Sequence, residues 1–261
     1  MMPPALSVVI PAYHEARRIA ATVETVAAYL GPRRGFELLV VDDGSADGTG
    51  RAVEAASGRH PEVRLIRLPQ HRGKGAAVRE GVRQAIGEVV CFTDADLSVP
   101  VDELEPLLDA LAEGCDAVLA ARTLPASVST GSPGPVRRVV SALFNLAVRA
   151  LFHVPFRDTQ CGFKGFRREA ARAVCARARI DGFVFDVEWL ILADRLGYRL
   201  GEIPVRYRHS RASSVRLVAH APQILADLWR LWSSLRAKTY RLPAARPTPA
   251  REHPATLPDG L

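Results

Sequence analysis

Short apolar runs alternate with segments of helical periodicity along the first half of the chain. Each run is apolar throughout rather than at every second position, which is typical of strands buried on both faces. Five runs predict strands, at 6–10, 36–41, 63–68, 88–93 and 116–120. Apolar residues recur at helical spacing over 15–30, 75–86 and 101–112. A further helix is expected after Asp47, which is a suitable N-cap residue.

This alternation predicts an α/β fold in which a mainly parallel sheet carries helices on both faces. Ligands of such sheets bind at the carboxyl ends of the strands. Two acidic clusters stand at predicted strand ends, Asp42-Asp43 after one and Asp94 with Asp96 after another. We expect them to follow two neighbouring strands, at the edge of the sheet where ligands bind.

The pattern changes after residue 122. Residues 124–135 are rich in Ser, Gly and Pro and predict a mobile loop. The segments 136–152 and 222–236 predict amphipathic helices with wide apolar faces, the second bordered by Trp229 and Trp232. Residues 241–261 contain five prolines without periodicity, so we expect a disordered tail behind a single domain spanning 1–240.

The formal net charge of +7 favours phosphate-bearing ligands, which include nucleic acids, nucleotides and anionic lipids. A nucleic-acid-binding protein is the alternative outside the enzymes, but the basic residues are spread along the chain and form no known nucleic-acid module. We therefore expect no nucleic-acid partner. The four cysteines contain no C-x-x-C pair, which indicates reduced thiols in a cytosolic protein. No signal peptide is visible, and the apolar stretches fall short of the ~20 residues of a membrane span.

Asp94-Ala95-Asp96 is the strongest candidate metal site. Two carboxylates one residue apart, in a turn after a strand, can hold Mg²⁺ or Mn²⁺ against a diphosphate. The metal would stabilise charge on a leaving nucleoside diphosphate. An acidic turn of this kind is also common on protein surfaces, so the motif alone does not establish the site.

Two further motifs are suited to a nucleotide. The carboxylates of Asp42 and Asp43 can accept hydrogen bonds from a nucleobase or from ribose hydroxyls, and Gly44 permits a close backbone approach. Lys74, in Arg72-Gly73-Lys74-Gly75, precedes a predicted helix and is placed to contact a phosphate. The segment is not a P-loop, because it lacks the G-x-x-x-x-G-K-[ST] pattern.

Six motifs occur along the chain at 9–15 (VIPAYHE), 41–45 (VDDGS), 73–75 (GKG), 93–98 (TDADLS), 158–164 (DTQCGFK) and 185–188 (FDVE). Together they resemble glycosyltransferase family 2, whose fold is GT-A, over roughly residues 5 to 236. The last two motifs resemble the dolichyl- and polyprenyl-phosphate sugar synthases, and most of all the dolichyl-phosphate glucose synthases.

The resemblance implies a role for each matching residue. The donor nucleotide would be held by Pro11, Tyr13, Glu15, Asp42, Asp43, Lys74 and Asp94. The metal would be held by Asp94, Asp96 and Ser98. Arg122, Arg137 and Arg138 would bind the acceptor phosphate, with Gln160 and Lys164 on the acceptor side. Asp158, Arg122 and Arg137 would be catalytic. Ser98 stands at the position where many mannose synthases have Gln. His14 stands between Tyr13 and Glu15, where Asn is common in the family.

The implied reaction transfers a sugar, with UDP-glucose favoured as donor, to a polyprenyl phosphate. A lipid phosphate is already anionic, so it needs placement and charge screening rather than a strong base, and in-line attack inverts the anomeric centre. GDP-mannose or a UDP-hexosamine is an alternative donor. A soluble or polysaccharide acceptor is also open; a hydroxyl acceptor would need a base such as Asp158, Asp186 or Glu188.

We expect the enzyme to be peripheral on the cytoplasmic face of a membrane, with its two amphipathic helices in the interface. A membrane-anchored partner subunit is compatible with that placement. The alternative is that both helices simply pack on the sheet.

Overall fold

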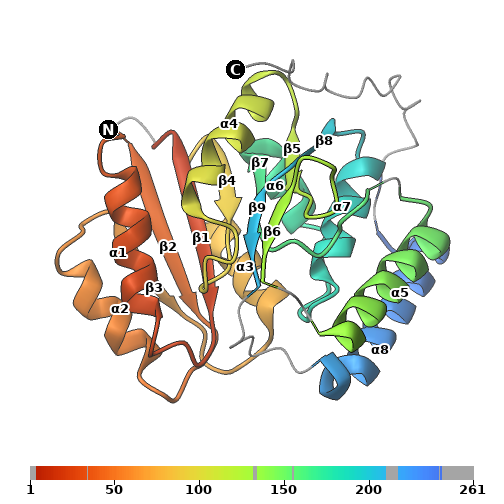
Figure 1. The fold of residues 1–261 in the computed structure, drawn as a ribbon, viewed down its shortest axis with the longest axis horizontal. Helices are drawn as coiled ribbons and strands as arrows, with labels where there is room; N and C mark the ends of the chain where they lie inside the picture. Colours follow the sequence, from red (N-terminus) through yellow and green to blue (C-terminus); the bar gives the residue numbers. More distant parts are fainter. Residues whose placement is uncertain are drawn as a thin grey trace.

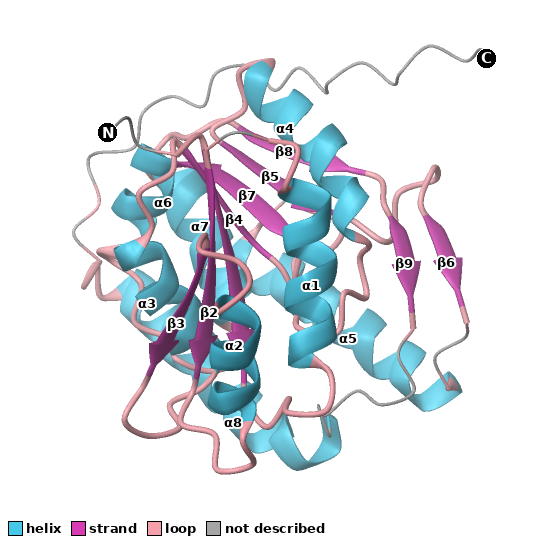
Figure 2. Ribbon diagram, turned by 90° about the vertical axis from the view of Figure 1, so that its left-hand side faces the viewer, coloured by secondary structure: helices cyan, strands magenta, loops and turns pink. Residues whose placement is uncertain are grey.

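A seven-stranded mixed sheet in the order β3-β2-β1-β4-β7-β5-β8 forms the centre of the molecule (Figure 1). The computed structural model describes residues 4–33, 35–131, 134–154, 156–209, 217–240 and 242, without the side chains of 135–137, 139 and 217–220. The strands of this sheet are β1 (Leu6–Ala12), β2 (Phe36–Asp42), β3 (Val63–Arg67), β4 (Val89–Phe92), β5 (Ala117–Ala120), β7 (Lys164–Arg167) and β8 (Leu200–Ile203). A separate pair, β6 (Val128–Thr130) and β9 (Arg206–Arg208), stands beside it (Figure 2).

The predicted α/β class with a mainly parallel sheet is confirmed. Only β7 of this sheet runs antiparallel to its neighbours, and it separates β4 from β5. One expectation was wrong: β2 and β4 are not adjacent, because β1 lies between them and pairs with both. The two acidic clusters therefore close strands that flank β1.

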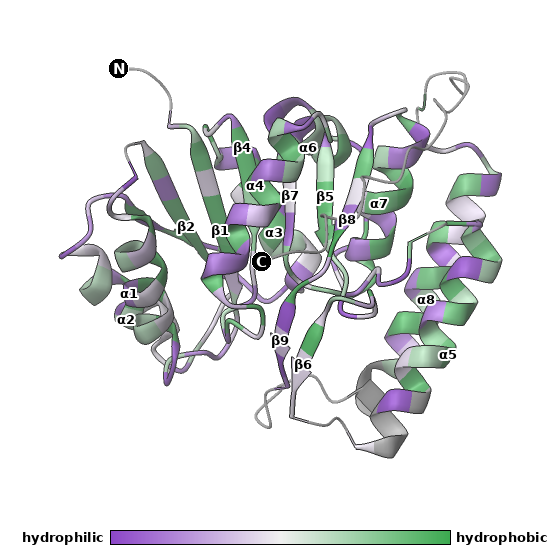
Figure 3. Cartoon of the chain, turned by 45° about the horizontal axis from the view of Figure 1, so that its top comes forward, coloured by the Kyte–Doolittle hydropathy of each residue, from purple (hydrophilic) through white to green (hydrophobic). Residues whose placement is uncertain are grey.

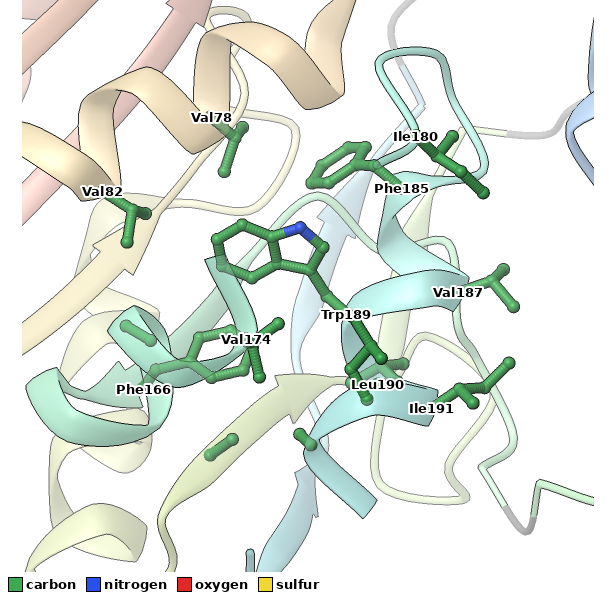
Figure 4. Close-up of a cluster of buried hydrophobic side chains, with 14 of the residues drawn as sticks. Val78, Val82, Phe166, Val174, Ile180, Phe185, Val187, Trp189, Leu190 and Ile191 are labelled. Atoms are coloured by element: carbon green, nitrogen blue, oxygen red, sulfur yellow. The ribbon is translucent and has the colours of Figure 1, made fainter. Parts of the chain in front are cut away.

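Helices cover both faces of the sheet. They are α1 (Ile19–Leu30), α2 (Thr49–Ser57), α3 (Lys74–Gln84), α4 (Leu104–Ala112, after a 3₁₀ turn at Val101–Glu103), α5 (Pro135–Phe152), α6 (Arg168–Cys175), α7 (Phe185–Arg195) and α8 (Leu217–Arg236). The apolar strands alternate between two cores: Val8 packs with α1, α2 and α4, whereas Val9 packs with α3, α6 and α7. Trp189 lies in the second core against Phe166 and Phe185 (Figure 4).

Two predictions about where helices begin need correction. The helix expected from residue 15 begins at Ile19, because the backbone N–H groups of Glu15 and Ala16 bond to the side chains of Thr49 and Asp47 instead. Gly48, with φ 94°, is the N-cap of α2. The Asp47 carboxylate still accepts the Thr49 N–H from one position upstream.

The expected loop at 124–135 contains β6, which pairs with β9. Its three strand residues are exposed, so no apolar run marked them. Residues 132 and 133 of that loop, like all of the 241–261 tail except Leu242, lie outside the described residues.

Helices α5 and α8 lie side by side at one end of the molecule (Figures 1 and 3). The apolar side of α8 that we expected at a membrane packs inward instead, with Leu228, Leu231 and Leu235 in the core. The exposed apolar side chains of the pair include Leu143 (60%) and Leu146 (63%), on the apolar face expected of α5, together with Leu225 (66%) and Trp229 (65%) of α8. Among the described helices, none has the length and apolarity required to span a bilayer.

Candidate active site

The turn after β4 presents two carboxylates. Leu97 adopts the left-handed region, with φ 45°, and the Ser98 N–H donates to Asp96 Oδ1 at 3.0 Å. Helix α1 also holds the backbone of this turn, because the Thr22 hydroxyl donates to the Ala95 carbonyl at 2.6 Å. Asp94 and Asp96 are thus fixed one residue apart, and carboxylate oxygens of this kind are the ligands that a hard cation prefers. In the part of the chain that the structure describes, no cluster of three or more His, Cys, Asp or Glu could hold a metal by itself.

Lys74 reaches this turn from the first residue of α3. Its Nζ lies 2.6 Å from Asp94 Oδ1. Burial acts to raise the pKa of Asp94, but the Lys74 ammonium outweighs it, and the pKa of this carboxyl lies below its usual value. Asp94 is therefore ionised at neutral pH and partly neutralised by a neighbouring cation.

Asp43 organises the loop before α3. Its carboxylate accepts the Arg72 N–H at 2.9 Å and the Gly73 N–H at 2.8 Å, and His71 Nδ1 lies 2.8 Å from Oδ2. The His71 ring stacks on Tyr13, with 3.8 Å between the ring centroids. Asp43, which is buried, and Tyr13 are therefore joined through His71, next to the start of α3 that carries Lys74.

Asp42 has different neighbours. Its Oδ1 accepts the Ser45 N–H at 3.0 Å, and the residue lines a cavity of about 400 Å³ together with Arg51 and Arg67. Successive residues of a strand point to opposite sides, which separates Asp42 from Asp43 although they adjoin in sequence. The structure thus places Asp42 and Asp43, both predicted to bind the donor nucleotide, in different surroundings.

Glu15 and Pro11 come from β1 and the turn that follows it. Glu15 is bonded to Arg18, with 2.7 Å between Oε2 and Nε. Burial raises the pKa of Glu15, and the negative charges of Asp96, Asp47 and Asp94 add to the rise against the effect of Arg18. This places Glu15 beside the acidic turn. Pro11 lies in β1, opposite Val41 of β2.

Arg122 and Asp158 form the best-connected ion pair of the site. Arg122 donates from Nε at 2.6 Å, from Nη2 at 2.9 Å and from its backbone N–H at 3.0 Å, all to the Asp158 carboxylate. Burial acts to raise the pKa of Asp158, but its bonds to Arg122 lower the pKa below the usual value. The guanidinium also lies 5.0 Å from the Tyr207 ring. Asp158 therefore positions Arg122.

The remaining predicted arginines lie on α5. Arg138 is exposed, and its backbone N–H donates to the Gly134 carbonyl at 3.1 Å. The side chain of Arg137 is outside the described residues.

Lys164 is fully buried at the start of β7. Its Nζ donates to Asp186 Oδ1 at 2.6 Å and also bonds to the Cys161 carbonyl. Burial raises the pKa of Asp186, although Lys164 and Lys74 act against the rise. Nearby, the Gln160 N–H donates to Asp158 at 3.2 Å, whereas its side-chain Nε2 is buried with no hydrogen-bond partner among the described residues.

Glu188 has no free oxygen. It accepts the N–H groups of Arg179 at 2.8 Å and Ile180 at 3.0 Å, and the Tyr240 hydroxyl at 2.5 Å. The three carboxylates considered as bases for a hydroxyl acceptor, Asp158, Asp186 and Glu188, are thus all buried and engaged.

Sequence reasoning assigned no individual role to three contributors, although it placed the 160–164 loop, which contains Gly162, on the acceptor side. A Cβ on Gly162 would lie 2.2 Å from Asp94 Oδ2, so a glycine is needed for the chain to pass the acidic turn. The Asp181 carbonyl accepts the N–H groups of Gly75 at 2.8 Å and Ala76 at 3.2 Å, which holds the first turn of α3. Gly162 stands within a recognised motif and so could have been found; Asp181 and Tyr207 carried no signal.

Comparison with known proteins identifies the family. The model of glycosyl transferase family 2 matches residues 7–175. The dolichyl-phosphate beta-glucosyltransferase ALG5C of Trichomonas vaginalis is 31% identical over 220 residues, covering 80% of this chain and 65% of the relative. The Saccharomyces cerevisiae dolichyl-phosphate beta-glucosyltransferase is 31% identical over 242 residues, covering 85% of this chain and 72% of the relative. This chain thus spans just under two thirds of the length of the Trichomonas protein.

Among solved structures, glucosyl-3-phosphoglycerate synthase from Mycobacterium tuberculosis, in complex with Mn²⁺, UDP-glucose and phosphoglyceric acid, superposes with a TM-score of 0.68. It is 23% identical, and the match covers 88% of this chain and 80% of that one. At this identity the likeness establishes a shared fold. Taken with the family model and the two relatives, it shows that the chain belongs to glycosyl transferase family 2.

Proposed function

We propose that this protein transfers glucose from UDP-glucose to a dolichyl or other polyprenyl phosphate, giving a lipid-linked monosaccharide with inversion at the anomeric carbon. The two relatives named as dolichyl-phosphate beta-glucosyltransferases support this acceptor and this sugar. The M. tuberculosis synthase, which shares the fold, binds UDP-glucose with Mn²⁺. GDP-mannose and UDP-hexosamines are tested as alternative donors.

The donor would occupy the edge where β1, β2 and β4 end. Tyr13 and Asp43 would contact the nucleoside, and Glu15 lies beside the acidic turn. Asp94 and Asp96 would hold Mg²⁺ or Mn²⁺, with Ser98 adjacent, and diphosphate oxygens would complete the metal shell. The metal, when bound, stabilises the negative charge of the leaving diphosphate. Lys74 adds a positive charge at the same place.

The state of the buried carboxylates is the observation that favours a phosphate acceptor. A sugar hydroxyl needs a base to accept its proton, and such a base needs an open oxygen and a suitable pKa. Asp158 is bonded through both oxygens to Arg122, and Glu188 through both oxygens to two N–H groups and Tyr240, whereas Asp186 is buried and bonded to Lys164 through Oδ1. A phosphate needs no base. It needs a fixed cation, which Arg122 supplies because Asp158 holds its guanidinium in place.

Gln160 and Arg138 extend this acceptor side. The buried Gln160 Nε2, which has no acceptor among the described residues, lies next to Asp158 and would donate to a phosphate oxygen. Arg138, and Arg137 beside it in sequence, lie near the start of α5. Lys164, tied to Asp186, adds a buried positive charge between the donor and acceptor sides.

The acceptor lipid places the reaction at a membrane surface. The exposed apolar side chains of α5 and α8 form a face suited to the interfacial layer, and Trp229 stacks on Trp232 at its border. We propose peripheral attachment through this face on the cytoplasmic side of the membrane. A membrane-anchored subunit could share in that attachment.

Transfer of radiolabelled sugar from a panel of UDP- and GDP-sugars to polyprenyl phosphate, with Mg²⁺, Mn²⁺ or EDTA, tests the proposal. We expect metal-dependent label in the lipid fraction from UDP-glucose, lost in Asp96→Ala. If folded protein that binds UDP gives no lipid product with any donor, a soluble or polysaccharide acceptor replaces the lipid phosphate.

A further inference from the structure

A second basic cavity lies behind the donor loop, between α3 and α6. It has a volume of about 430 Å³ and is lined by four arginines, Arg72, Arg79, Arg83 and Arg172. Glu80 is its one acidic lining residue, and Leu68 adds apolar surface. Arg72 stands in the loop before Lys74, where its backbone N–H bonds to Asp43; the other lining residues lie outside the proposed donor and acceptor sites. The volume lies in the range of small-molecule sites in proteins.

Positive charge exceeds negative charge in this arginine cavity. Arg83 is paired with Glu80 at 2.7 Å, and Arg72 and Arg79 share the single carboxylate of Asp181. Four guanidiniums therefore face two carboxylates, a surplus of two positive charges. Arg172 has no carboxylate partner among the described residues; its Nη2 lies 3.4 Å from the Ala85 carbonyl.

One of the arginines is also incompletely bonded. Arg79 Nη1 is buried and has no hydrogen-bond partner within the described part of the chain. A buried donor without a partner costs free energy, which a ligand oxygen would recover. Arginine donors match phosphate oxygens in charge and in geometry.

We propose that the arginine cavity binds a phosphate-bearing anion, which the surplus of two positive charges on its arginines favours. The anion is either a free phosphorylated metabolite or the headgroup of an anionic lipid. It would compete with Asp181 for Arg72 and Arg79, and the Asp181 carbonyl holds the first turn of α3. Occupation of the cavity is therefore linked to the segment that carries Lys74.

Calorimetric titration with inorganic pyrophosphate in the presence of EDTA tests the free-anion arm, since EDTA removes metal-bridged binding at Asp94 and Asp96. We expect one pyrophosphate per chain for the unmodified protein and at least tenfold weaker binding for the double variant Arg83→Gln/Arg172→Gln. Both side chains are exposed, so the variant should keep its melting temperature. Arg59→Gln/Arg199→Gln removes the same charge from exposed arginines outside the cavity and should bind like the unmodified protein.

Flotation with phosphatidylcholine vesicles, with and without phosphatidylglycerol, tests the lipid arm on the same variants. Phosphatidylglycerol-dependent flotation lost only in the cavity variant assigns the lipid headgroup, whereas a loss confined to pyrophosphate binding assigns a free anion. If the unmodified protein binds neither probe, or the two double variants lose binding equally, the cavity is not a phosphate site.

Discussion

Lys74 and Asp94 form an ion pair, 2.6 Å from Nζ to Oδ1, that joins the start of α3 to the turn after β4. The two residues before Lys74 donate their backbone N–H groups to Asp43, at the end of β2. Residues 72–74 therefore bridge two acidic clusters that β1 keeps apart. We expect a nucleotide bound at this edge of the sheet to depend on this segment, because it holds the two clusters in a fixed relation.

Gly75 is needed for that connection. A Cβ at this position would lie 2.6 Å from the Ile180 carbonyl oxygen and 2.6 Å from Phe185 Cβ. We expect Gly75→Ala to lower the free energy of unfolding by roughly 1–3 kcal/mol through overpacking and to weaken UDP binding. Gly134→Ala is the matched control, because a Cβ there meets no atom within 4 Å. Thermal unfolding and UDP titration would contradict the assignment if both variants behaved alike.

Asp96 should be needed for turnover and dispensable for folding. Its carboxylate is bonded to the Ser98 N–H only two residues away, so Asp96→Asn should leave the melting temperature nearly unchanged. We expect sugar transfer to fall by on the order of 100-fold or more, as loss of a metal ligand implies. Asp109→Asn, at an exposed position of α4, controls for charge. Activity within tenfold of the unmodified enzyme would remove Asp96 from the metal site.

The Arg122–Asp158 pair makes a pH-dependent contribution to stability. The pKa of Asp158 is depressed in the folded protein, so its stabilising contribution is present above the unfolded pKa of about 3.9 and is lost as the pH falls through the folded value. Arg122→Met would leave a buried carboxylate without its cation and should cost about 3 kcal/mol at neutral pH.

This difference between Arg122→Met and the unmodified protein should shrink in acid, because Asp158 then becomes protonated and needs no cation. Urea unfolding at a series of pH values measures it, with Arg195→Met at an exposed position of α7 as control. A difference that does not vary with pH would show that Arg122 stabilises the protein without Asp158.

Membrane attachment should depend on the exposed side chains of α5 and α8. We expect Leu146→Ser and Trp229→Ser each to reduce co-sedimentation with vesicles about tenfold, since burying one large apolar side chain contributes about 1.5–3 kcal/mol. Ile86→Ser, which removes a comparably exposed apolar side chain (48%) between α3 and β4, should have no effect. Equal binding by all three variants would mean that this face does not meet the membrane.

The strands that the sequence predicted are those whose own residues form an apolar run. Apolar runs such as 36–41 are buried on both faces and therefore stand out in the sequence. Strand β7 did not, because its first residue is a lysine whose burial depends on Asp186, contributed by α7. Strand β6 did not either, because its residues are exposed and it is stabilised by pairing with β9.

The residues of the candidate site likewise fall into those that the sequence could predict and those that it could not. Residues in short motifs, such as Asp94 and Asp96, could be predicted because neighbours in sequence are neighbours in space. The bond of Arg122 to Asp158 joins residues far apart in the chain, and no spacing reveals it. The inward packing of α8 was also hidden, since an apolar stripe looks the same whether a core or a lipid covers it.

Strand β7 sets the distance between the two halves of the candidate site. The acidic turn follows β4, Arg122 follows β5, and β7 is inserted between them with Lys164 opposite both Phe92 and Leu119. Neighbouring strands lie about 4.8 Å apart, so the two strand ends are held about 10 Å from each other. If the donor and the acceptor phosphate bind at these two strand ends as proposed, the backbone of the sheet sets the distance between them. Side-chain changes that alter the choice of sugar would leave that distance unchanged.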